Sequence, residues 1–554
     1  MTTRTPRFTT LLAGGALLAT ALAATTPAAT PRFYTDDPVW VDQDTEDASR
    51  VTFLETDLVA DLAYNLIVGG SHIVDIRAGN VNTVDEVPDS SWFTGRAGRR
   101  SLTPEDIRRG PDTSTGPAGR TWTVTASKSD GVTPGFTILD AEGTRWFLKF
   151  DPPGYRGMAT GTEVAVTKLM WALGYHVPEN HIASLGEEQL VVGEGATITV
   201  AGRRRPMTAG DVRALLARVA REPDGSYRVV ASRALEGRPV GRIRFFGTRS
   251  DDPNDIVPHE HRRELRGYGV FAAWLNHSDA KSINSLDTLV SEGGRTFVRH
   301  HLLDFGSALG SGSVAPADYW RGAEHLLDPR GVAASLVTLG FRPPRWHREP
   351  FYERPAIGRF PLDNTAFDPD GWRPHVPNRA FLHARADDRF WAARTLVALR
   401  TDLIRAAVES GRFEDAEAED FLVRALAQRR DAIARAYLVA VNPIVDPMLD
   451  AQGHLSFGNA AVEADVAPAP ARYHAAWWTF DNTTGDTDVL GATVGETTSM
   501  EAPPGLPRTP GAYVKVALWS TGTGHLAWQA PVHAYFRLLA DGWRLVGFER
   551  LPEA

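Results

Sequence analysis

The chain has 554 residues, a formal net charge of −9, 43% hydrophobic and 23% charged residues, and no cysteine. This length exceeds what one hydrophobic core supports, so we expect several domains of about 50–200 residues each. The proportion of hydrophobic to charged residues is ordinary for a globular protein, and the acidic net charge argues against nucleic acid as a partner. The lack of cysteine excludes a disulfide scaffold and a lipoprotein anchor.

The N-terminus has the pattern of an export signal. Arg4 and Arg7 precede an apolar run over residues 11–24, and residues 21–23 (Ala-Leu-Ala) fit a small-residue cleavage site. The run is too short for a membrane span, and no later segment is long and apolar enough to cross a bilayer. We therefore expect a signal peptide over residues 1–23 and an exported protein, periplasmic or extracellular and soluble after cleavage. The alternative is a disordered Ala/Thr-rich tail.

Residues 24–120 are expected to form an N-terminal extension that packs on the core and carries no chemistry of its own. Apolar spacing over residues 57–67 predicts a short amphipathic helix. Thr103 followed by Pro104 predicts the start of another helix.

An alternating pattern begins after this extension. It predicts three antiparallel strands, at residues 122–126, 136–140 and 145–150. The turn between the first two contains Gly131 and Gly135. The third strand contains Lys149, whose neighbours Leu148 and Phe150 point to the opposite side of the strand.

A helix is predicted over residues 161–173, ending at Gly174, and it has Glu163 in its first turn. A lysine among bulky apolar strand residues must reach a partner or solvent, and Glu163 is well placed to meet Lys149. The alternative is a surface lysine and a glutamate that only favours the helix N-terminus.

A candidate hinge strand at residues 189–192 leads to a longer, mainly helical region over residues 194–445. The pattern of apolar and polar residues does not assign a role to residues 195–245. His259, Glu260 and His261 are expected to be a polar cluster at a helix start, because residues i and i+2 on a helix do not share a face and cannot jointly bind zinc.

The densest group of polar residues follows an apolar helix that ends at Leu275. Asp279, Lys281 and Asn284 have the spacing D-x-K-x-x-N. A hairpin is predicted across residues 292–294, and Asp304 lies at the end of its second strand, directly before Phe305-Gly306.

The ordered set of these residues resembles the protein-kinase-like superfamily, and within it the atypical bacterial HipA-like toxin kinases and CotH-like spore-coat kinases. The spacing D-x-K-x-x-N equals that of the Ser/Thr kinase catalytic loop. The resemblance implies an α+β fold with two lobes: an antiparallel β N-lobe over residues 121–193 and a mainly helical C-lobe over residues 194–445.

The same resemblance implies a site for Mg²⁺ and ATP. Asp279 would accept the proton of the substrate hydroxyl, and Lys281 would neutralise the moving phosphoryl group. Asn284 and Asp304 would hold the metal. The nucleotide site would consist of Lys149 with Glu163 as its helix partner, and of Gly131 and Gly135 in the turn over the phosphates. Ser278 stands where many kinases have an arginine that receives an activation-loop phosphate, which argues against that mode of regulation.

Helices are predicted over residues 388–410 and 416–441, where apolar residues recur every three or four positions. Short strands then dominate residues 455–554, and Asp541-Gly542 predicts a tight hairpin. We expect a small C-terminal all-β, sandwich-like domain. Its tryptophans are either core residues or a face that stacks on a cell-envelope glycan, and they are Trp477, Trp478, Trp519 and Trp543.

The expected function is transfer of the γ-phosphoryl group of Mg-ATP to a protein or small-molecule hydroxyl by an atypical kinase-like enzyme. Two alternatives remain: a catalytically inactive pseudokinase that serves as an envelope binding or scaffold protein, and an adenylyltransferase on the same fold. The expected partners are a nucleotide and an unidentified acceptor.

Overall fold

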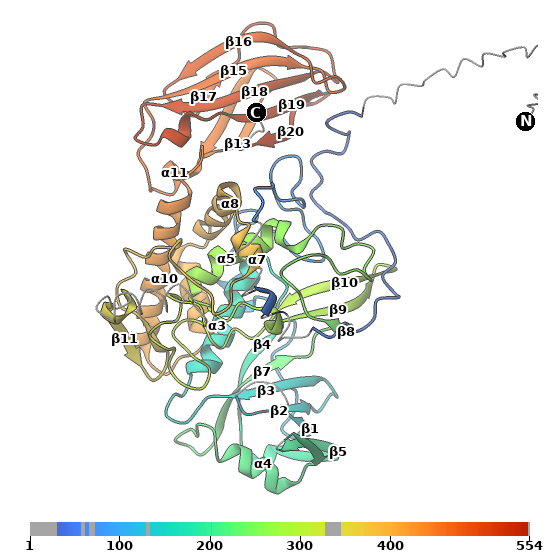
Figure 1. Cartoon of the computed structure of the whole chain (residues 1–554), viewed down its shortest axis with the longest axis vertical. Coiled ribbons are helices and arrows are strands. Elements are labelled where there is room, and N and C mark those ends of the chain that lie inside the picture. Colours follow the sequence, from blue (N-terminus) through green and yellow to red (C-terminus); the bar gives the residue numbers. More distant parts are fainter. Residues whose placement is uncertain are drawn as a thin grey trace, which may run out of the picture.

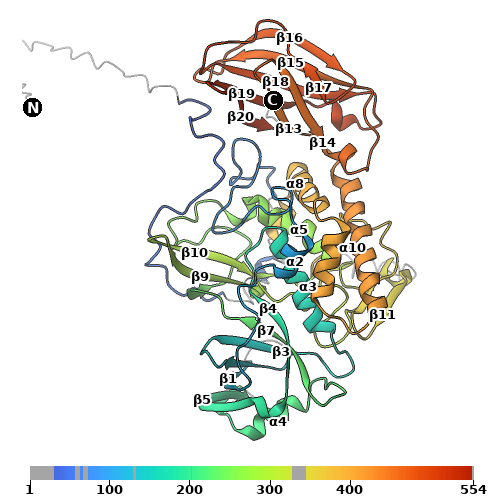
Figure 2. The ribbon, with the colours of Figure 1, turned by 180° about the vertical axis from the view of Figure 1, so that it is seen from behind.

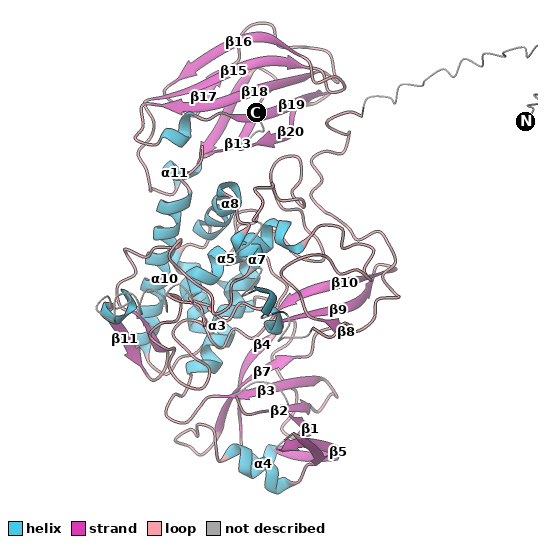
Figure 3. Ribbon diagram, viewed as in Figure 1, coloured by secondary structure: helices cyan, strands magenta, loops and turns pink. Residues whose placement is uncertain are grey.

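The structure is a computed structural model, and it describes residues 30–56, 61, 63–65, 73–128, 133–200, 202–326 and 345–551. Within these ranges the fold is α+β, with helices concentrated between two β regions (Figures 1 and 3). The expected signal peptide and Gly131 lie outside the described residues, as does most of the helix expected over residues 57–67. No helix in the described part of the chain has both the length and the apolar character that a membrane span requires.

A seven-stranded sheet lies at one end of the molecule, in the order β4-β7-β3-β2-β1-β5-β6 (Figure 1). Its strands are β1 (Trp122–Ser127), β2 (Gly135–Leu139), β3 (Arg145–Phe150), β4 (Asn180–Leu185), β5 (Leu190–Val200), β6 (Arg203–Pro206) and β7 (Tyr227–Arg233). The first three are antiparallel neighbours and lie where the alternating pattern predicted them.

This sheet extends further along the chain than the sequence suggested. The boundary expected at residues 193/194 falls inside β5, which pairs in parallel with β1 and then turns into β6. After α4 (Ala209–Leu216), β7 inserts between β3 and β4. The strand continues across the expected hinge because Ala196 and Ile198 are buried in the same core as Val124.

The helical region consists mainly of α3 (Met158–Ala172), α5 (Arg263–Leu275), α8 (Ala386–Val397), α9 (Thr401–Ser410) and α10 (Ala416–Tyr437), with α7 (Arg379–Leu382) beside α5. The single helix expected over residues 388–410 is two helices. Arg400 is extended between them, so that α8 packs on α5 while α9 packs on α3.

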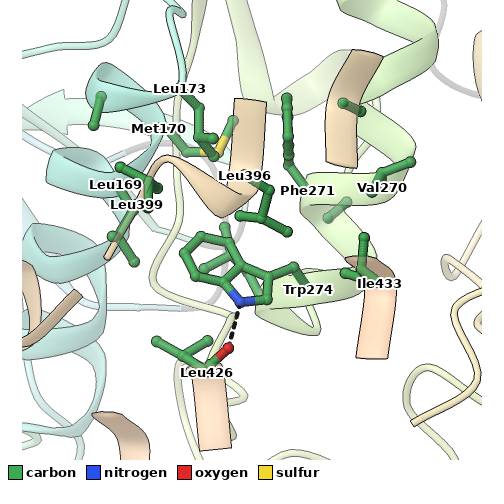
Figure 4. Close-up of a cluster of buried hydrophobic side chains, with 14 of the residues drawn as sticks. Leu169, Met170, Leu173, Val270, Phe271, Trp274, Leu396, Leu399, Leu426 and Ile433 are labelled. Atoms are coloured by element: carbon green, nitrogen blue, oxygen red, sulfur yellow. Dashed lines mark hydrogen bonds between the residues drawn. The ribbon is translucent and has the colours of Figure 1, made fainter. Parts of the chain in front are cut away.

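The core of this region joins the helices that carry or precede the polar motifs. Figure 4 shows Trp274 of α5 among apolar side chains of α3, α8 and α10, with its indole N–H donating to the carbonyl of Leu426 at 2.8 Å. Trp274 is fully buried and anchors α5 in the core that it shares with α3, α8 and α10.

Smaller elements complete this part of the chain. The short helix α2 (Pro104–Arg109) begins directly after the N-cap Thr103, as the sequence predicted, and Thr103 and Asp106 also form a capping box. A three-stranded sheet has the order β10-β9-β8, with β8 (Arg238–Gly241), β9 (Ser285–Glu292) and β10 (Arg295–Leu302). Strands β11 (Phe351–Arg354) and β12 (Gly358–Pro361) form a separate hairpin.

The C-terminal strands form two sheets at the other end of the molecule. One contains β13 (Ile444–Leu449), β14 (His454–Asn459) and β17 (Ser499–Glu501); the other has the order β16-β15-β18-β19-β20. The bounds of the latter are β15 (Arg472–Phe480), β16 (Thr487–Gly495), β18 (Tyr513–Thr521), β19 (Val532–Leu539) and β20 (Gly542–Glu549). Side chains of both sheets share one core, and β13 begins before the expected start at residue 455.

The four C-terminal tryptophans do not share one exposed face. Trp477 is fully buried between the two sheets, and Trp543 packs against the same core. Trp519 and Trp478 are half-buried elsewhere on the sheet; Trp519 stacks on His474, and the ring of Trp478 lies 5.8 Å from the ammonium of Lys515. The expected alternative of a four-tryptophan glycan surface is therefore not formed, because the strand alternation sends these side chains in different directions.

Residues 32–56, here called the N-terminal strap, run from the C-terminal sheet to the central part of the molecule (Figure 2). At one end Phe33 packs between Phe480 and Tyr535 on the C-terminal sheet. At the other end Ala48 and Leu54 donate backbone hydrogen bonds to residues of β10 and β8. The strap thus contacts the C-terminal sheet as well as the central part of the molecule.

Candidate active site

Lys149 joins three segments that are far apart in the sequence. Its ammonium Nζ lies 3.1 Å from Oε2 of Glu163 on α3 and 2.9 Å from Oδ1 of Asp304, which follows β10. The two neighbours Leu148 and Phe150 are buried on the other side of β3 in the sheet core. The strand alternation therefore sends Lys149 toward the helices, as the sequence suggested.

Glu163 also holds the segment after Asp304. Its carboxylate accepts hydrogen bonds from the backbone N–H groups of Phe305 at 3.1 Å and Gly306 at 3.0 Å. A Cβ at Gly306 would lie 3.1 Å from Oε2 of Glu163, so the absence of a side chain there permits the close approach. The Phe305 ring is fully buried, 5.6 Å from the ring of His277.

The charges of this group stabilise one another. Burial alone would lower the pKa of Lys149, but the carboxylates of Glu163 and Asp304 outweigh it and raise that pKa. The Lys149 charge in turn lowers the pKa of Asp304, although its burial acts in the opposite direction. Lys149 and Asp304 are therefore both charged at neutral pH in this arrangement.

The second group, Asp279, Lys281 and Asn284, is also assembled. Lys281 Nζ lies 2.7 Å from Oδ1 of Asp279, and the Asn284 amide donates to Oδ2 of Asp279 at 2.9 Å and to its carbonyl at 2.8 Å. The backbone C=O of Asn284 accepts from Leu303 N–H at 2.9 Å, which places this loop beside the residue before Asp304.

Asp279 and Asp304 are close enough for each to influence the other electrostatically, because the charge of Asp279 acts to raise the pKa of Asp304. Asp304 is in the left-handed region at φ 58°, an unfavourable conformation for a residue with a side chain and one that concentrates at functional sites. Two carboxylates and the Asn284 amide supply the oxygen ligands that Mg²⁺ prefers, so the residues fit such an ion. No cluster of three or more His, Asp or Glu side chains arranged for a metal occurs in the described ranges.

Burial would raise the pKa of Asp279, but a hydrogen bond from His375 and the charge of Lys281 lower it well below its usual value. His375 did not emerge from the sequence as a site residue. It lies 96 positions after Asp279 in an irregular segment, and no spacing or periodicity connects the two.

Arg321 is a second residue that the sequence did not single out. Its side chain is mostly buried and influences Asp279 electrostatically, although burial lowers the pKa of its guanidinium. Its contacts are long: 3.5 Å to the carbonyl of Ser311 and 3.9 Å to Asp318. It therefore adds positive charge near Asp279.

Of the two candidate glycines, Gly135 is the first residue of β2 rather than part of the turn before it, and it pairs directly with Lys149. A Cβ at Gly135 would lie 2.2 Å from the backbone oxygen of Leu148, so the close approach of β2 and β3 requires glycine. Its position beside Lys149 is compatible with a place near a nucleotide, but packing alone accounts for the residue. Gly131 lies outside the described residues.

No protein-family model matches the chain, and no curated protein matches it. Two solved structures of a Golgi casein kinase are weakly similar, each with a TM-score of 0.28. One is 10% identical and the match covers 73% of this chain and 94% of that chain; the other, with Mn and ADP bound, is 11% identical, with 71% and 94% covered. This likeness does not place the chain in a family, and it gives no support to the finer resemblance to HipA-like or CotH-like kinases.

Proposed function

We propose that the chain is an exported, atypical phosphotransferase of the two-lobed protein-kinase-like type, which transfers the γ-phosphoryl group of ATP to a hydroxyl. The observation that carries this proposal is the double contact of Lys149 with Glu163 and Asp304, beside the Asp279–Lys281–Asn284 group. In this assignment the seven-stranded sheet with α3 is the N-lobe, and the rest of the helical region is the C-lobe. The finer likeness to HipA-like or CotH-like kinases is part of the proposal.

Each residue has a role that follows from its charge and contacts. Lys149 is the cation for the α- and β-phosphates, and Glu163 keeps it in place. Asp279, ionised and held by Asn284, orients the acceptor hydroxyl and takes its proton. Lys281 neutralises the phosphoryl group in transit. The acceptor oxygen forms a bond to the γ-phosphorus as the bond from that phosphorus to the bridging oxygen of ADP breaks.

Asn284 and Asp304 would hold Mg²⁺, and the ion when bound supplies charge neutralisation at the phosphates. The carboxylate of Asp304 is 45% exposed, so it is accessible to a ligand even though one of its oxygens now contacts Lys149. Nucleotide binding would thus exchange the Lys149–Asp304 contact for contacts of both residues with the ligand.

The test begins with binding. The melting temperature of the chain from residue 24 onward is measured with and without Mg-ATP, because a ligand that binds only the folded state must raise it. We expect an increase for the wild type and for Asp279→Asn, and none for Asp304→Ala. No increase for the wild type would contradict the nucleotide site.

Transfer is then measured as ADP and phosphate release with water as acceptor, and as mass added to the protein itself. We expect the wild type to transfer a phosphoryl group and Asp279→Asn to lose transfer. An equal rate in Asp279→Asn overturns the role of Asp279. Binding without transfer in the wild type favours the scaffold alternative, and a nucleotidyl mass favours adenylyl transfer.

A further inference from the structure

His375 is a buried residue, 6% exposed, that contacts the loop containing Asp279 in three ways. Its Nδ1 lies 3.4 Å from Oδ1 of Asp279, and its Nε2 lies 2.9 Å from the hydroxyl of Ser278. Its backbone N–H donates to the carbonyl of Ser278 at 2.7 Å. Two consecutive residues of the loop are therefore held by one histidine from a distant segment.

We propose that His375 is a positioning residue for Asp279: Ser278 fixes its imidazole so that the Nδ1–H points at the Asp279 carboxylate and sets its orientation for phosphoryl transfer. This inference rests on the proposed function. It assigns to His375 no contact with substrate or nucleotide.

The hydrogen-bonding chemistry of the three side chains selects this arrangement. An ionised carboxylate only accepts hydrogen bonds, so Nδ1 must carry a proton to interact favourably with Asp279. In the neutral imidazole Nε2 is then an acceptor, and the fully buried Ser278 hydroxyl can donate to it. The Asp279 carboxylate thus determines that Nδ1 carries the proton, and the Ser278 hydroxyl, which can donate or accept, pairs with Nε2 and holds the ring in this orientation.

The other contacts of Asp279 explain why this support matters. Oδ2 accepts from Asn284, while Oδ1 is shared by Lys281 and His375. Lys281 is a flexible, 35% exposed side chain, and in the proposed reaction its charge turns to the phosphoryl group. His375 then remains as the buried hydrogen-bond donor to Oδ1.

The surroundings of His375 restrict its movement. The indole of Trp320 lies with its centroid 5.2 Å from the imidazole centroid. The charged or titratable groups near this cluster include Asp279, Lys281, His277, Arg321, Asp304 and Tyr268. His277 is fully buried, and its burial lowers its pKa to about 4, so Arg321 and Lys281 are the cations present around Asp279 at neutral pH.

The experiment compares the full chain from residue 24 onward with His375→Ala, His375→Gln and Ser278→Ala; His454→Gln, at an exposed position on β14, is the control. We expect His375→Ala to lower kcat by about ten- to a hundredfold, as for other residues that orient a reacting group. The KM for ATP and the melting-temperature increase with Mg-ATP should stay unchanged. Glutamine can donate one hydrogen bond and should restore part of kcat.

The pH profile separates positioning from general damage to the fold. Loss of the Nδ1–H donor raises the pKa of Asp279, so the activity of His375→Ala should disappear at a higher pH than that of the wild type. Ser278→Ala should show a smaller shift in the same direction. If His375→Ala keeps the wild-type kcat and loses activity at the same low pH as the wild type, the positioning role is overturned.

A measurement without turnover distinguishes this failure from failure of the proposed function. Nitrogen-15 NMR of the imidazole, assigned by its loss in His375→Gln, reports the protonated nitrogen. We expect the wild-type spectrum to show a proton on Nδ1 of His375, and the nitrogen-15 shifts of this imidazole to change in Asp279→Asn. Protonation at Nε2 alone contradicts the inference whatever the activity. A wild type that shows the Nδ1–H signal but transfers nothing contradicts the proposed function instead.

Discussion

The ammonium of Lys149 lies 2.9 Å from Oδ1 of Asp304, a residue 155 positions later in the chain. This contact joins β3 to the loop after β10 and places two residues of opposite charge where the proposed nucleotide would bind. Because Asp304 is also a proposed ligand of Mg²⁺, we expect ligand binding to rearrange this contact.

Replacing Glu163 with glutamine should weaken both the fold and the nucleotide site. Glu163 is 2% exposed and accepts from Lys149, Phe305 and Gly306, whereas glutamine has a single oxygen and would direct an amide N–H group at one of these donors. We expect a loss of about 1.5–3 kcal/mol in the free energy of unfolding, typical of a hydrogen bond to a charged group. Urea unfolding measures it, with the exposed Glu188→Gln as control; equal stability of the two variants would contradict the contacts.

Gly135→Ala should destabilise the seven-stranded sheet. The added Cβ would lie 2.2 Å from the backbone oxygen of Leu148, which can move only if β2 and β3 separate. We expect a loss of about 1–3 kcal/mol in the free energy of unfolding, as for other overpacked positions. Gly524→Ala is the matched control, since a Cβ there meets no atom within 4 Å. Equal urea midpoints for the two variants would show that β2 and β3 are not this close.

Phe33→Ala should loosen the N-terminal strap from the C-terminal sheet. The Phe33 ring is 5% exposed and lies 5.1 Å from the ring of Tyr535, centroid to centroid. Truncating a buried phenylalanine costs about 3–5 kcal/mol. Hydrogen exchange should therefore become faster in β15 and β19, while Tyr34→Ala, at a 54% exposed neighbour, should leave it unchanged. Unchanged exchange in both variants would mean that the strap does not bind there.

The ion pair between Arg32 of the strap and Glu549 of β20 should make the stability of the fold depend on pH. Burial opposes ionisation of Glu549, but His533 and Arg32 outweigh it and lower the pKa of Glu549 to about 2, from an ordinary value of 4.5. A carboxylate with a lowered pKa stabilises the fold at pH values above its unfolded pKa, and this contribution is lost as the pH falls toward the folded pKa.

We therefore expect Glu549→Gln to be less stable than the wild type at pH 6, with the difference shrinking between about pH 4.5 and pH 2. Urea unfolding at a series of pH values measures it, and Glu496→Gln, at an exposed position, serves as control. A difference that stays constant across this pH range would exclude an ionic contribution from Glu549.

Several features could be predicted from the sequence because their signals are local. Alternation located β1, β2 and β3 and assigned Lys149 to the side away from the apolar core. The spacing of Asp279, Lys281 and Asn284 is short enough that one loop brings them together, and the structure shows these contacts. Thr103 and Pro104 predicted the start of α2, since capping depends on neighbouring residues.

Other features depend on segments that meet only after folding. His375 contacts Asp279 across 96 positions, and Phe33 hydrogen-bonds with Asn482 across 449. The return of β7 between β3 and β4 extends the sheet past the boundary expected at residues 193/194. The break at Arg400 follows from packing of α8 and α9 on different helices, although the apolar period continues through it. Periodicity and capping report the immediate neighbours of a residue, whereas the choice of a distant partner depends on burial and shape that exist only in the folded chain. The local elements and the short-range motif could thus be predicted from neighbouring residues, whereas the set of residues around Asp279 depends on how distant segments pack in the folded chain.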